Sequence, residues 1–368
     1  SERLLANNTP VKNVTDLYVN AAADGSATPI LKTALNKMQA SAVEGGQHLA
    51  GLGAAKNAAV TIKGVALNGT DASAITDIAN SGNKALMEKA GFESGLASYL
   101  ATQKPNISNV ADLFVNHTSQ GAVGAMDAAD VKGMQTAADA GLKNLGALSR
   151  KQNQSANVGT VYFDKDQADT VTQVANSGNK ALMEKVGFDS TLANYLTTNK
   201  PTVKGVGDLY VNYTGENGVA DYSKGNLQKI KHNLAEGQQL LDGLAAKPNE
   251  SITLEGVTLS GDQHQAIVNA MNLGAPGRDA LVGAGMDAGL ADHLVANPVG
   301  QQSLTHVALN IAPQTGKTID AADMKGFVAN MASIKAANPM NMKSSDALTL
   351  GGFTLSGESH QAVVDAMN

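Results

Sequence analysis

The apolar residues of the chain form two kinds of pattern, and the first has helical spacing. From about Asp127 to Lys151 the sequence is rich in alanine, with apolar residues three or four positions apart: Val131, Met134, Ala138, Leu142, Leu145 and Leu148. Residues at this spacing share one helix face, so we expect a long helix with these side chains buried. The matching helix near the N-terminus is expected to begin at Thr28-Pro29, a cap followed by proline in the first turn.

The second pattern is short and typical of strands. Thr253 to Leu259 has apolar residues on both sides of Gly256, which predicts a small hairpin or a bent strand. Ser260-Gly261-Asp262 then offers capping groups for a helix whose apolar face includes Ile267 and Met271.

Three further helices are expected around the middle of the chain. The helix that contains Ile267 and Met271 has a counterpart 96 residues earlier in the chain. We expect this earlier helix to run on through Asn176 to Glu184 and to break at Gly187. Two shorter helices follow. One contains Leu192, Tyr195 and Leu196 and is stopped by Pro201, and the other contains Val206, Leu209, Tyr210 and Val211.

These patterns recur with a fixed period. The segments Ala79–Lys89 and Ala175–Lys185 have the same eleven residues, ANSGNKALMEK, 96 positions apart. A motif of Asp, Leu, an aromatic residue, Val and Asn recurs at the same interval, at Asp16–Asn20, Asp112–Asn116 and Asp208–Asn212. Single apolar residues also recur every 96 positions, at Leu67, Phe163, Leu259 and Leu355. We therefore expect a mainly α protein with short β hairpins, built as a tandem repeat of about 96 residues with about four units.

The expected boundaries follow from this period. They are a partial unit at 1–60, units at 61–156 and 157–251, a diverged unit at 252–347 and a partial unit at 348–368. Four full units would exceed the 368 residues by 16, and the stretch that is lacking corresponds to Ser81–Leu96. The chain also does not begin with Met, so we expect a processed product or a segment of a longer array. The alternatives are that the partial units join within one molecule, or that they join head to tail between molecules.

Composition and charge narrow the classes of function. Charged residues are only 16% of the chain and the net charge is −6, with Lys and Arg scattered rather than clustered. Nucleic-acid binding needs clustered cations, so no nucleic acid is expected as a partner. Cysteine is absent, which excludes disulfides and thiolate metal sites. No apolar run approaches the roughly 20 residues of a membrane helix, so no membrane span is expected.

Part of each unit resembles a known module. The segments Ala85–Phe92, Gly95–Leu100 and Ser108–Val115 follow the order of helix, glycine, acidic turn, Gly-Leu-x-Tyr and apolar helix. This order resembles the short helical repeats of bacterial secreted and surface-layer proteins, a module similar to a phycobilisome linker domain. Phe92 and Leu100 depart from that pattern, which usually has Arg and an aromatic residue there. The resemblance implies an exported structural or adhesive protein.

Several residues could carry chemistry, but each also has a structural interpretation. His264 and His360 occupy corresponding places and could bind a metal, yet no second His stands four residues away. The pairs Asp127/Asp130 and Asp320/Asp323 are better explained as charges at helix N-termini than as an acid/base pair. Asp164-Lys165-Asp166 and Asp24-Gly25-Ser26 lack the full set of calcium ligands. Asn-x-Ser/Thr sequons begin at Asn13, Asn106, Asn116 and Asn212.

These observations favour a non-catalytic role, with no catalytic residues, metal ligands or cofactor expected. We expect a structural or adhesive building block of an extracellular assembly (surface layer, filament or matrix) that forms through head-to-tail packing, located outside the cell or at its surface. Its expected partners are copies of itself, with another surface protein or a glycan as further candidates. One alternative is a repeat scaffold that binds a ligand or protein, in which exposed positions differ between units while core positions match. The other is an enzyme with its site in the third unit, which carries His264, His293 and His306.

Overall fold

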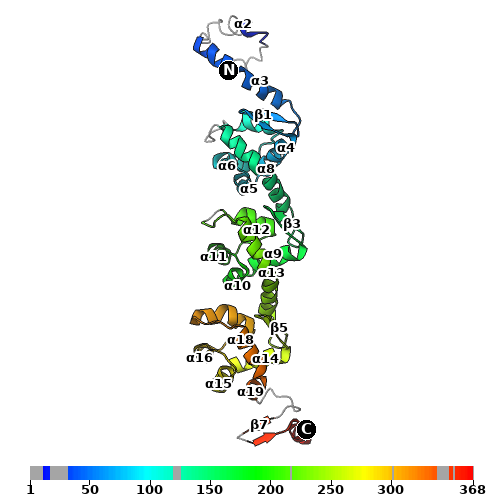
Figure 1. The fold of residues 1–368 in the computed structure, drawn as a ribbon, viewed down its shortest axis with the longest axis vertical. Coiled ribbons are helices and arrows are strands. Elements are labelled where there is room, and N and C mark those ends of the chain that lie inside the picture. Colours follow the sequence, from blue (N-terminus) through cyan, green and yellow to red (C-terminus); the bar gives the residue numbers. More distant parts are fainter. Residues whose placement is uncertain are drawn as a thin grey trace. The chain divides into compact units, whose positions relative to one another are not determined.

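The computed structural model describes residues 11–16, 32–118, 126–215, 218–300, 302–337, 348–350 and 353–367. The chain divides into two compact units, Ser1–Leu145 and Gly146–Asn368, called unit 1 and unit 2. In both, helices predominate and the strands form short hairpins (Figure 1), as the sequence predicts. The boundaries predicted at 61, 157, 252 and 348 stay predictions.

Unit 1 is assembled around a single hairpin. Its elements are α2 (Val14–Asp16), α3 (Lys32–Leu52), β1 (Val60–Ile62), β2 (Val65–Leu67), α4 (Gly69–Ala79), α5 (Lys84–Lys89), α6 (Ser94–Gln103), α7 (Val110–Asp112), the π-helical η2 (Leu113–His117) and most of α8 (Ala128–Leu148).

Unit 2 contains three hairpins and the helices that follow them. The first set is β3 (Ala156–Val158), β4 (Val161–Phe163), α9 (Lys165–Asn176), α10 (Lys180–Val186), α11 (Ser190–Asn199), α12 (Val206–Tyr213) and α13 (Lys224–Ala245). The second is β5 (Ile252–Leu254), β6 (Val257–Leu259), α14 (Gly261–Met271), α15 (Ala275–Gly283), α16 (Ala288–Ala296), α17 (Leu304–His306), the π-helical η3 (Val307–Ile311), the 3₁₀ turn η4 (Ala312–Thr315), α18 (Ala321–Ala329) and α19 (Met331–Ala336). The last is β7 (Leu348–Leu350), β8 (Phe353–Leu355) and α20 (Gly357–Met367).

The four hairpins begin 96 residues apart, at Val60, Ala156, Ile252 and Leu348. Each pairs two three-residue antiparallel strands, and in the first three hairpins a two-residue turn joins the strands. In the first turn both central residues, Lys63 and Gly64, have positive φ. That combination is typical of a type I′ turn, whose twist matches the twist of the strands. In these three hairpins, a two-residue turn therefore converts a short apolar segment into a hairpin.

A capped helix follows each hairpin. Ser260 caps α14: its side chain accepts a hydrogen bond from the Gln263 N–H, and Gln263 reaches back to the Ser260 backbone. Asp164 forms the same capping box with Gln167 at α9, and Asn68 caps α4. The prediction of capping groups at Ser260-Gly261-Asp262 is confirmed, because capping depends on residues three positions apart in the sequence.

The prediction that one helix runs through Asn176 to Glu184 is wrong. α9 ends at Asn176 and α10 begins at Lys180. Gly178 has a φ of +66°, outside the helical range, and the Asn179 side chain caps the new helix by accepting from the Leu182 N–H at 3.0 Å. The sequence Ser-Gly-Asn thus stops one helix and starts the next.

The buried face of α8 differs from the predicted one in its second half. Val131, Met134 and Ala138 are buried, but Leu142 is 39% exposed and Gly141 faces inward instead. A Cβ built on Gly141 would lie 2.6 Å from Ile78 Cδ1. The helix backbone therefore approaches α4 so closely that glycine occupies the contact, and the leucine beside it is turned outward. The predicted helix start at Thr28-Pro29 lies outside the described residues.

A close crossing of two helices recurs three times. Near the C-terminal end of each long helix (α3, α8 and α13), one residue packs against a short helix (α7, α12 and α17). The pairs are Gly51 with Ala111 in unit 1, and Ala147 with Gly207 and Gly243 with Thr305 in unit 2. A Cβ added to Gly51 or to Gly207 would lie 2.7 Å from the Cβ of its partner. The crossing has room for only one of the two side chains, so one residue of each pair is glycine.

In unit 2, α13 packs against two successive sets of elements, whose buried residues form one continuous core. It packs on α9 and α10, and also on β5 and α17 of the following set. Gly237 in its middle lies against Val186, while Gly243 near its end lies against Thr305. One helix therefore joins two sets of elements into one compact body. Among the described residues, no helix combines the length and the apolarity that a membrane span requires.

The crossing predicts the effect of a single methyl group. Gly207→Ala should destabilise unit 2 by about 1–3 kcal/mol, because the new Cβ overlaps the main chain and the side chain of Ala147. Gly146→Ala is the matched control, since no atom lies within 4 Å of a Cβ there, and it should be neutral or stabilise by up to about 1 kcal/mol. Urea unfolding followed by circular dichroism measures both.

A second substitution tests whether the crossing itself is the cause. Adding Ala147→Gly to Gly207→Ala recreates the order of the Gly51–Ala111 pair and should recover part of the lost stability. A double variant no more stable than Gly207→Ala would contradict this explanation.

Candidate functional site

The Asp-Leu-aromatic-Val-Asn motif at Asp112–Asn116 lies on α7 and the π-helical η2, into which α7 continues directly. The copy at Asp208–Asn212 lies on α12, which is a regular α-helix. Of the copy at Asp16–Asn20, only Asp16 is among the described residues. In unit 2, the π-helical η3 follows α17 as η2 follows α7. Because π-helical turns often occur at functional sites, the polar residues around η2 are the first candidate site.

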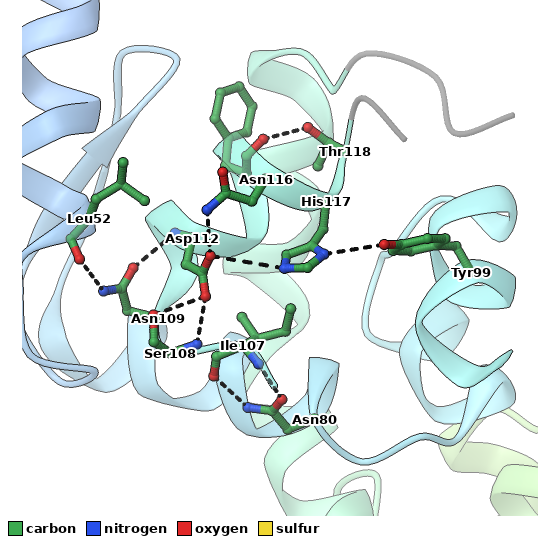
Figure 2. Close-up of polar contacts among 11 residues, drawn as sticks. Leu52, Asn80, Tyr99, Ile107, Ser108, Asn109, Asp112, Asn116, His117 and Thr118 are labelled. Atoms are coloured by element: carbon green, nitrogen blue, oxygen red, sulfur yellow. Dashed lines mark hydrogen bonds and ion pairs between the residues drawn. The ribbon is translucent and has the colours of Figure 1, made fainter. Parts of the chain in front are cut away.

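Asp112 is the centre of this polar network (Figure 2). Its carboxylate accepts hydrogen bonds from the Ser108 N–H at 2.8 Å, the Ser108 hydroxyl at 2.9 Å and Asn116 Nδ2 at 2.8 Å. Burial alone would raise the pKa of Asp112, but the hydrogen bonds from Ser108 and Asn116 together outweigh it, so this pKa is below its usual value. The ionised carboxylate therefore stabilises the start of its own helix by accepting hydrogen bonds from Ser108.

Asn109 connects the same helix to the preceding long helix. Its side-chain oxygen caps α7 by accepting from the Asp112 N–H at 2.9 Å. Its Nδ2 donates to the Ala54 carbonyl at 2.9 Å, just beyond the end of α3, and lies 3.4 Å from the carbonyl oxygen of Leu52, the last residue of α3 (Figure 2). In unit 2 the equivalent residue is Gly205, where a Cβ would lie 3.3 Å from the Arg150 carbonyl oxygen. Close packing at Gly205 replaces the hydrogen bond that Asn109 makes.

His117 lies between Asp112 and Tyr99 (Figure 2). Its Nε2 is 3.9 Å from Asp112 Oδ1, and its Nδ1 is 3.4 Å from the Tyr99 hydroxyl. The equivalent residues in unit 2 are Tyr213 and Tyr195, whose rings are 6.2 Å apart. Asp112 already receives three closer hydrogen bonds, and its distance to His117 is too long for a hydrogen bond. The arrangement orients the imidazole, but it lacks the short contacts of a proton relay.

An asparagine clamp, which the sequence did not lead us to expect, connects two segments in three of the sets. Asn80 Nδ2 donates to the Ile107 carbonyl at 2.8 Å, and Asn80 Oδ1 accepts from the Ile107 N–H at 2.9 Å. Asn176 makes the same pair of bonds with Val203, and Asn272 with Gly300. The amide satisfies both backbone groups of an otherwise unpaired residue. The available signal was an Asn at the same place in each copy, but its partner, 27 or 28 residues away, is not visible in the sequence.

The three histidines of the third predicted unit have separate surroundings. His264 is fully buried: Nδ1 lies 2.9 Å from the Glu250 carbonyl oxygen, and Nε2 accepts from the Leu304 N–H at 3.0 Å. His306 Nδ1 lies 3.3 Å from Asn310 Nδ2, and His293 is on α16. Burial lowers the pKa of His264, against the opposing effect of the Glu250 and Lys247 carbonyls, and also lowers that of His306. His264 is therefore a neutral bridge between two backbone segments, at a position where the earlier sets have Ala72 and Ala168.

The remaining sequence candidates occupy turns and helix ends. Asp127 accepts from the Asp130 N–H, and Asp130 accepts in return from the Asp127 N–H; Asp320 and Asp323 do the same. Within the described ranges, no three or more His, Asp or Glu side chains are grouped so that they could hold a metal ion. The segment Asp24-Gly25-Ser26 lies outside those ranges. Among the sequons, the side chains of Asn13, Asn116 and Asn212 make local hydrogen bonds, and Asn106 is exposed.

An open groove recurs between the first helix of a set and its long helix. In unit 1 it is lined by residues of α4 and its cap together with Leu142 of α8, and in unit 2 by residues of α9 and α13. The equivalent lining pairs are Thr70 and Asp166, Ser73 and Asp169, Ala74 and Thr170, Asp77 and Gln173, and Leu142 and Gln238. The groove is thus built at the same place in both units but with different polar groups.

The buried His264 predicts how stability depends on pH. An unfolded histidine takes up a proton near pH 6.5, whereas folded His264, with its lowered pKa, resists protonation. The unfolding free energy should therefore be unaffected well above that pH and should fall as the pH drops below it, by up to about 1.4 kcal/mol per pH unit. His264→Gln should cost about 1–3 kcal/mol at neutral pH and reduce this pH dependence. Urea unfolding at several pH values checks both effects, and an equally steep pH dependence in the variant would contradict the first.

Comparisons with protein-family models, with curated proteins and with solved structures found no match. The resemblance of Ala85–Phe92 and the segments after it to a secreted-protein module stays a prediction.

Proposed function

We propose that the chain is a non-catalytic, structural tandem-repeat protein of about four 96-residue units that serves as a building block of an extracellular assembly. The observation that carries this proposal is that α13 packs against two successive sets of elements in unit 2. Its N-terminal part packs on α9 and α10, and its C-terminal part packs on β5 and α17. Repeats that share an element are mechanically coupled to their neighbours, which suits an assembly that bears load along its length.

The use of the polar residues supports the same proposal. Asp112, Asn80 and His264 are the residues most suggestive of chemistry, and each makes hydrogen bonds to backbone groups of the fold. The asparagine clamp and the glycine crossing occur in three sets. Repeated residues that stabilise the same local contacts are expected of a building block whose units have one shape.

An ion pair between successive sets of unit 2 adds to the coupling. Lys185, at the end of α10, is 2.9 Å from Glu255 in the turn of the next hairpin and 3.6 Å from Glu236 of α13. The Glu255 hydrogen bond and charge raise the pKa of Lys185 against the effect of burial. Because these groups are partly exposed, the pair contributes less than about 1 kcal/mol, and it serves mainly to fix the relation between the two sets.

The proposed location, outside the cell or at its surface, rests on the resemblance to secreted modules and on the structural role. The proposed partners are copies of the same chain, with a surface protein or a glycan as further candidates.

Localisation in the source organism tests this function. Antibodies against the chain should label the cell surface or an extracellular layer in electron micrographs, and deletion of the gene should remove or thin that layer. A strain deleted for an unrelated cytoplasmic protein is the control for labelling. Retention of the protein in the cytosolic fraction, with an unchanged surface after deletion, would refute the proposal.

The recurring groove favours a second candidate function, a repeat scaffold that binds a polar ligand. Core positions such as Leu86 and Leu182 match between units, whereas the groove positions Ser73 and Asp169 differ. Carboxylate, amide and hydroxyl groups in an open groove can hydrogen-bond the hydroxyls of an oligosaccharide.

An oligosaccharide titration followed by NMR tests the scaffold. Gln238→Ala, in the groove of unit 2, should weaken binding by about tenfold, the loss of one or two hydrogen bonds. Leu142→Ala is the matched control, because it changes the equivalent position in unit 1, where the lining has fewer polar side chains. Equal losses in the two variants, or no binding by the wild type, would exclude a selective site in unit 2.

A further inference from the structure

The N-terminal part of α3 exposes a face that is buried in the other two long helices. Met38 is 41% exposed, whereas Met134 and Ile230, at the equivalent positions of α8 and α13, are each 1% exposed. In α13 this face packs on α9 and α10. The first long helix therefore has the sequence of a packed helix on a surface that is open to solvent.

A glycine at the same position of each long helix shows the same contrast between α3 and the other two. Gly45, Gly141 and Gly237 are equivalent, 96 residues apart. A Cβ on Gly141 would lie 2.6 Å from Ile78 Cδ1, and one on Gly237 would lie 2.7 Å from Val186 Cγ2, but no described atom lies within 4 Å of a Cβ on Gly45. Glycine inside an exposed helix costs roughly 0.5–1 kcal/mol relative to alanine. A helix packed on Gly45, as helices are packed on Gly141 and Gly237, would offset this cost.

The complementary face is exposed on α20. Val363 is 45% exposed and Met367 is 82% exposed. Their equivalents in α14, Ile267 and Met271, are 0% and 1% exposed. α20 follows the hairpin β7–β8 as α4 follows β1–β2 and α9 follows β3–β4. α20 therefore corresponds to the helix that follows each hairpin, but its apolar positions Val363 and Met367 are exposed to solvent. α3 corresponds to the long helix that packs on such a helix, and its apolar position Met38 is exposed as well.

A polar contact fixes the register in which a long helix meets its hairpin. Gln135 Nε2 of α8 donates to the Ala66 carbonyl of β2 at 2.9 Å, and Lys231 Nζ of α13 donates to the Tyr162 carbonyl of β4 at 2.7 Å. The equivalent donor on α3 is Gln39, and the equivalent carbonyl belongs to Thr354 of β8. Both halves of the contact are therefore present in the chain.

We infer that α3 of one molecule docks on β8 and α20 of a second copy of the chain, in the register that α8 and α13 adopt on their own hairpins. Gln39 then donates to the Thr354 carbonyl of the other molecule, Gly45 packs over Ala366, and Met38, Val363 and Met367 become buried. Because the two faces differ, the contact is head to tail and can extend into a filament. This inference rests on the proposed function, for which it names the partner and the surfaces.

Self-association of the full chain tests the interface. Sedimentation velocity of the wild type should show oligomers that grow with concentration. Gly45→Leu and Met367→Lys each block one face at an exposed position, and each should raise the dissociation constant by at least about tenfold. Val43→Asp is the matched control: Val43 is 74% exposed, and its equivalent in α8 is the exposed Asp139, so this variant should assemble like the wild type.

Mixing the two blocked variants distinguishes this interface from others. Gly45→Leu retains a working α20 face and Met367→Lys retains a working α3 face, so the mixture should form heterodimers that do not grow further. The chain has no cysteine, so Gln39→Cys on one molecule and Thr354→Cys on another can be joined by a short thiol cross-linker, and only the mixture should give a covalent dimer.

Three results would overturn the inference: a wild type that stays monomeric at the highest soluble concentration, a Gly45→Leu variant that assembles like the wild type, or a Gln39→Cys/Thr354→Cys double variant that cross-links within one molecule rather than between molecules. A monomeric chain that still labels the cell surface would remove this interface and leave the proposed function standing. If the purified chain assembles but the antibodies do not label the cell surface, the proposed function is refuted and this interface stands.

Discussion

The close crossing of a long helix over the next short helix is the contact on which the structure depends. It places the backbones so near that one residue of each pair is glycine, and the glycine changes sides: Gly51 faces Ala111, whereas Ala147 faces Gly207. The constraint thus acts on the pair: the side chain of one residue occupies the space that a Cβ on the other would need, and at Gly207 the main chain of Ala147 limits that space further. Because the crossing brings together the end of one set and the middle of the next, the hairpin and the asparagine clamp are positioned relative to it.

At equivalent places in different sets, different residues contact the same backbone groups. Asn109 reaches the Ala54 carbonyl in unit 1, and Gly205 packs directly against the equivalent carbonyl in unit 2. In the diverged set, His264 is added as a bridge to the Leu304 N–H. Buried backbone groups need partners, but different side chains can supply them. Residues that look like candidates for catalysis, such as Asp112 and His264, therefore have backbone partners, an observation that supports the proposed structural function.

The candidate site could be only partly predicted from the sequence. The motif at Asp112 and the capping of α14 at Ser260 were recognisable, because their contacts lie within a few residues. The bridge formed by His264 and the clamp formed by Asn80 were not, because their partners lie 40 and 27 residues away. The helix break after Asn176 had a local signal, Ser-Gly-Asn, which the apolar spacing on either side obscured.

The sequence by itself determined the 96-residue spacing of its matching segments, the hairpin at Thr253–Leu259 and the cap of α14, since strand alternation, turns and caps are set by neighbouring residues. Only the tertiary structure decided which residues face inward. Leu142 has the spacing of a core residue, but Gly141 takes the contact because the helix backbone has to come within reach of Ile78. The packing of α13 against two successive sets of elements, and the contrast between exposed Gly45 and its packed equivalents, likewise depend on distances between segments far apart in the chain, which no local pattern specifies.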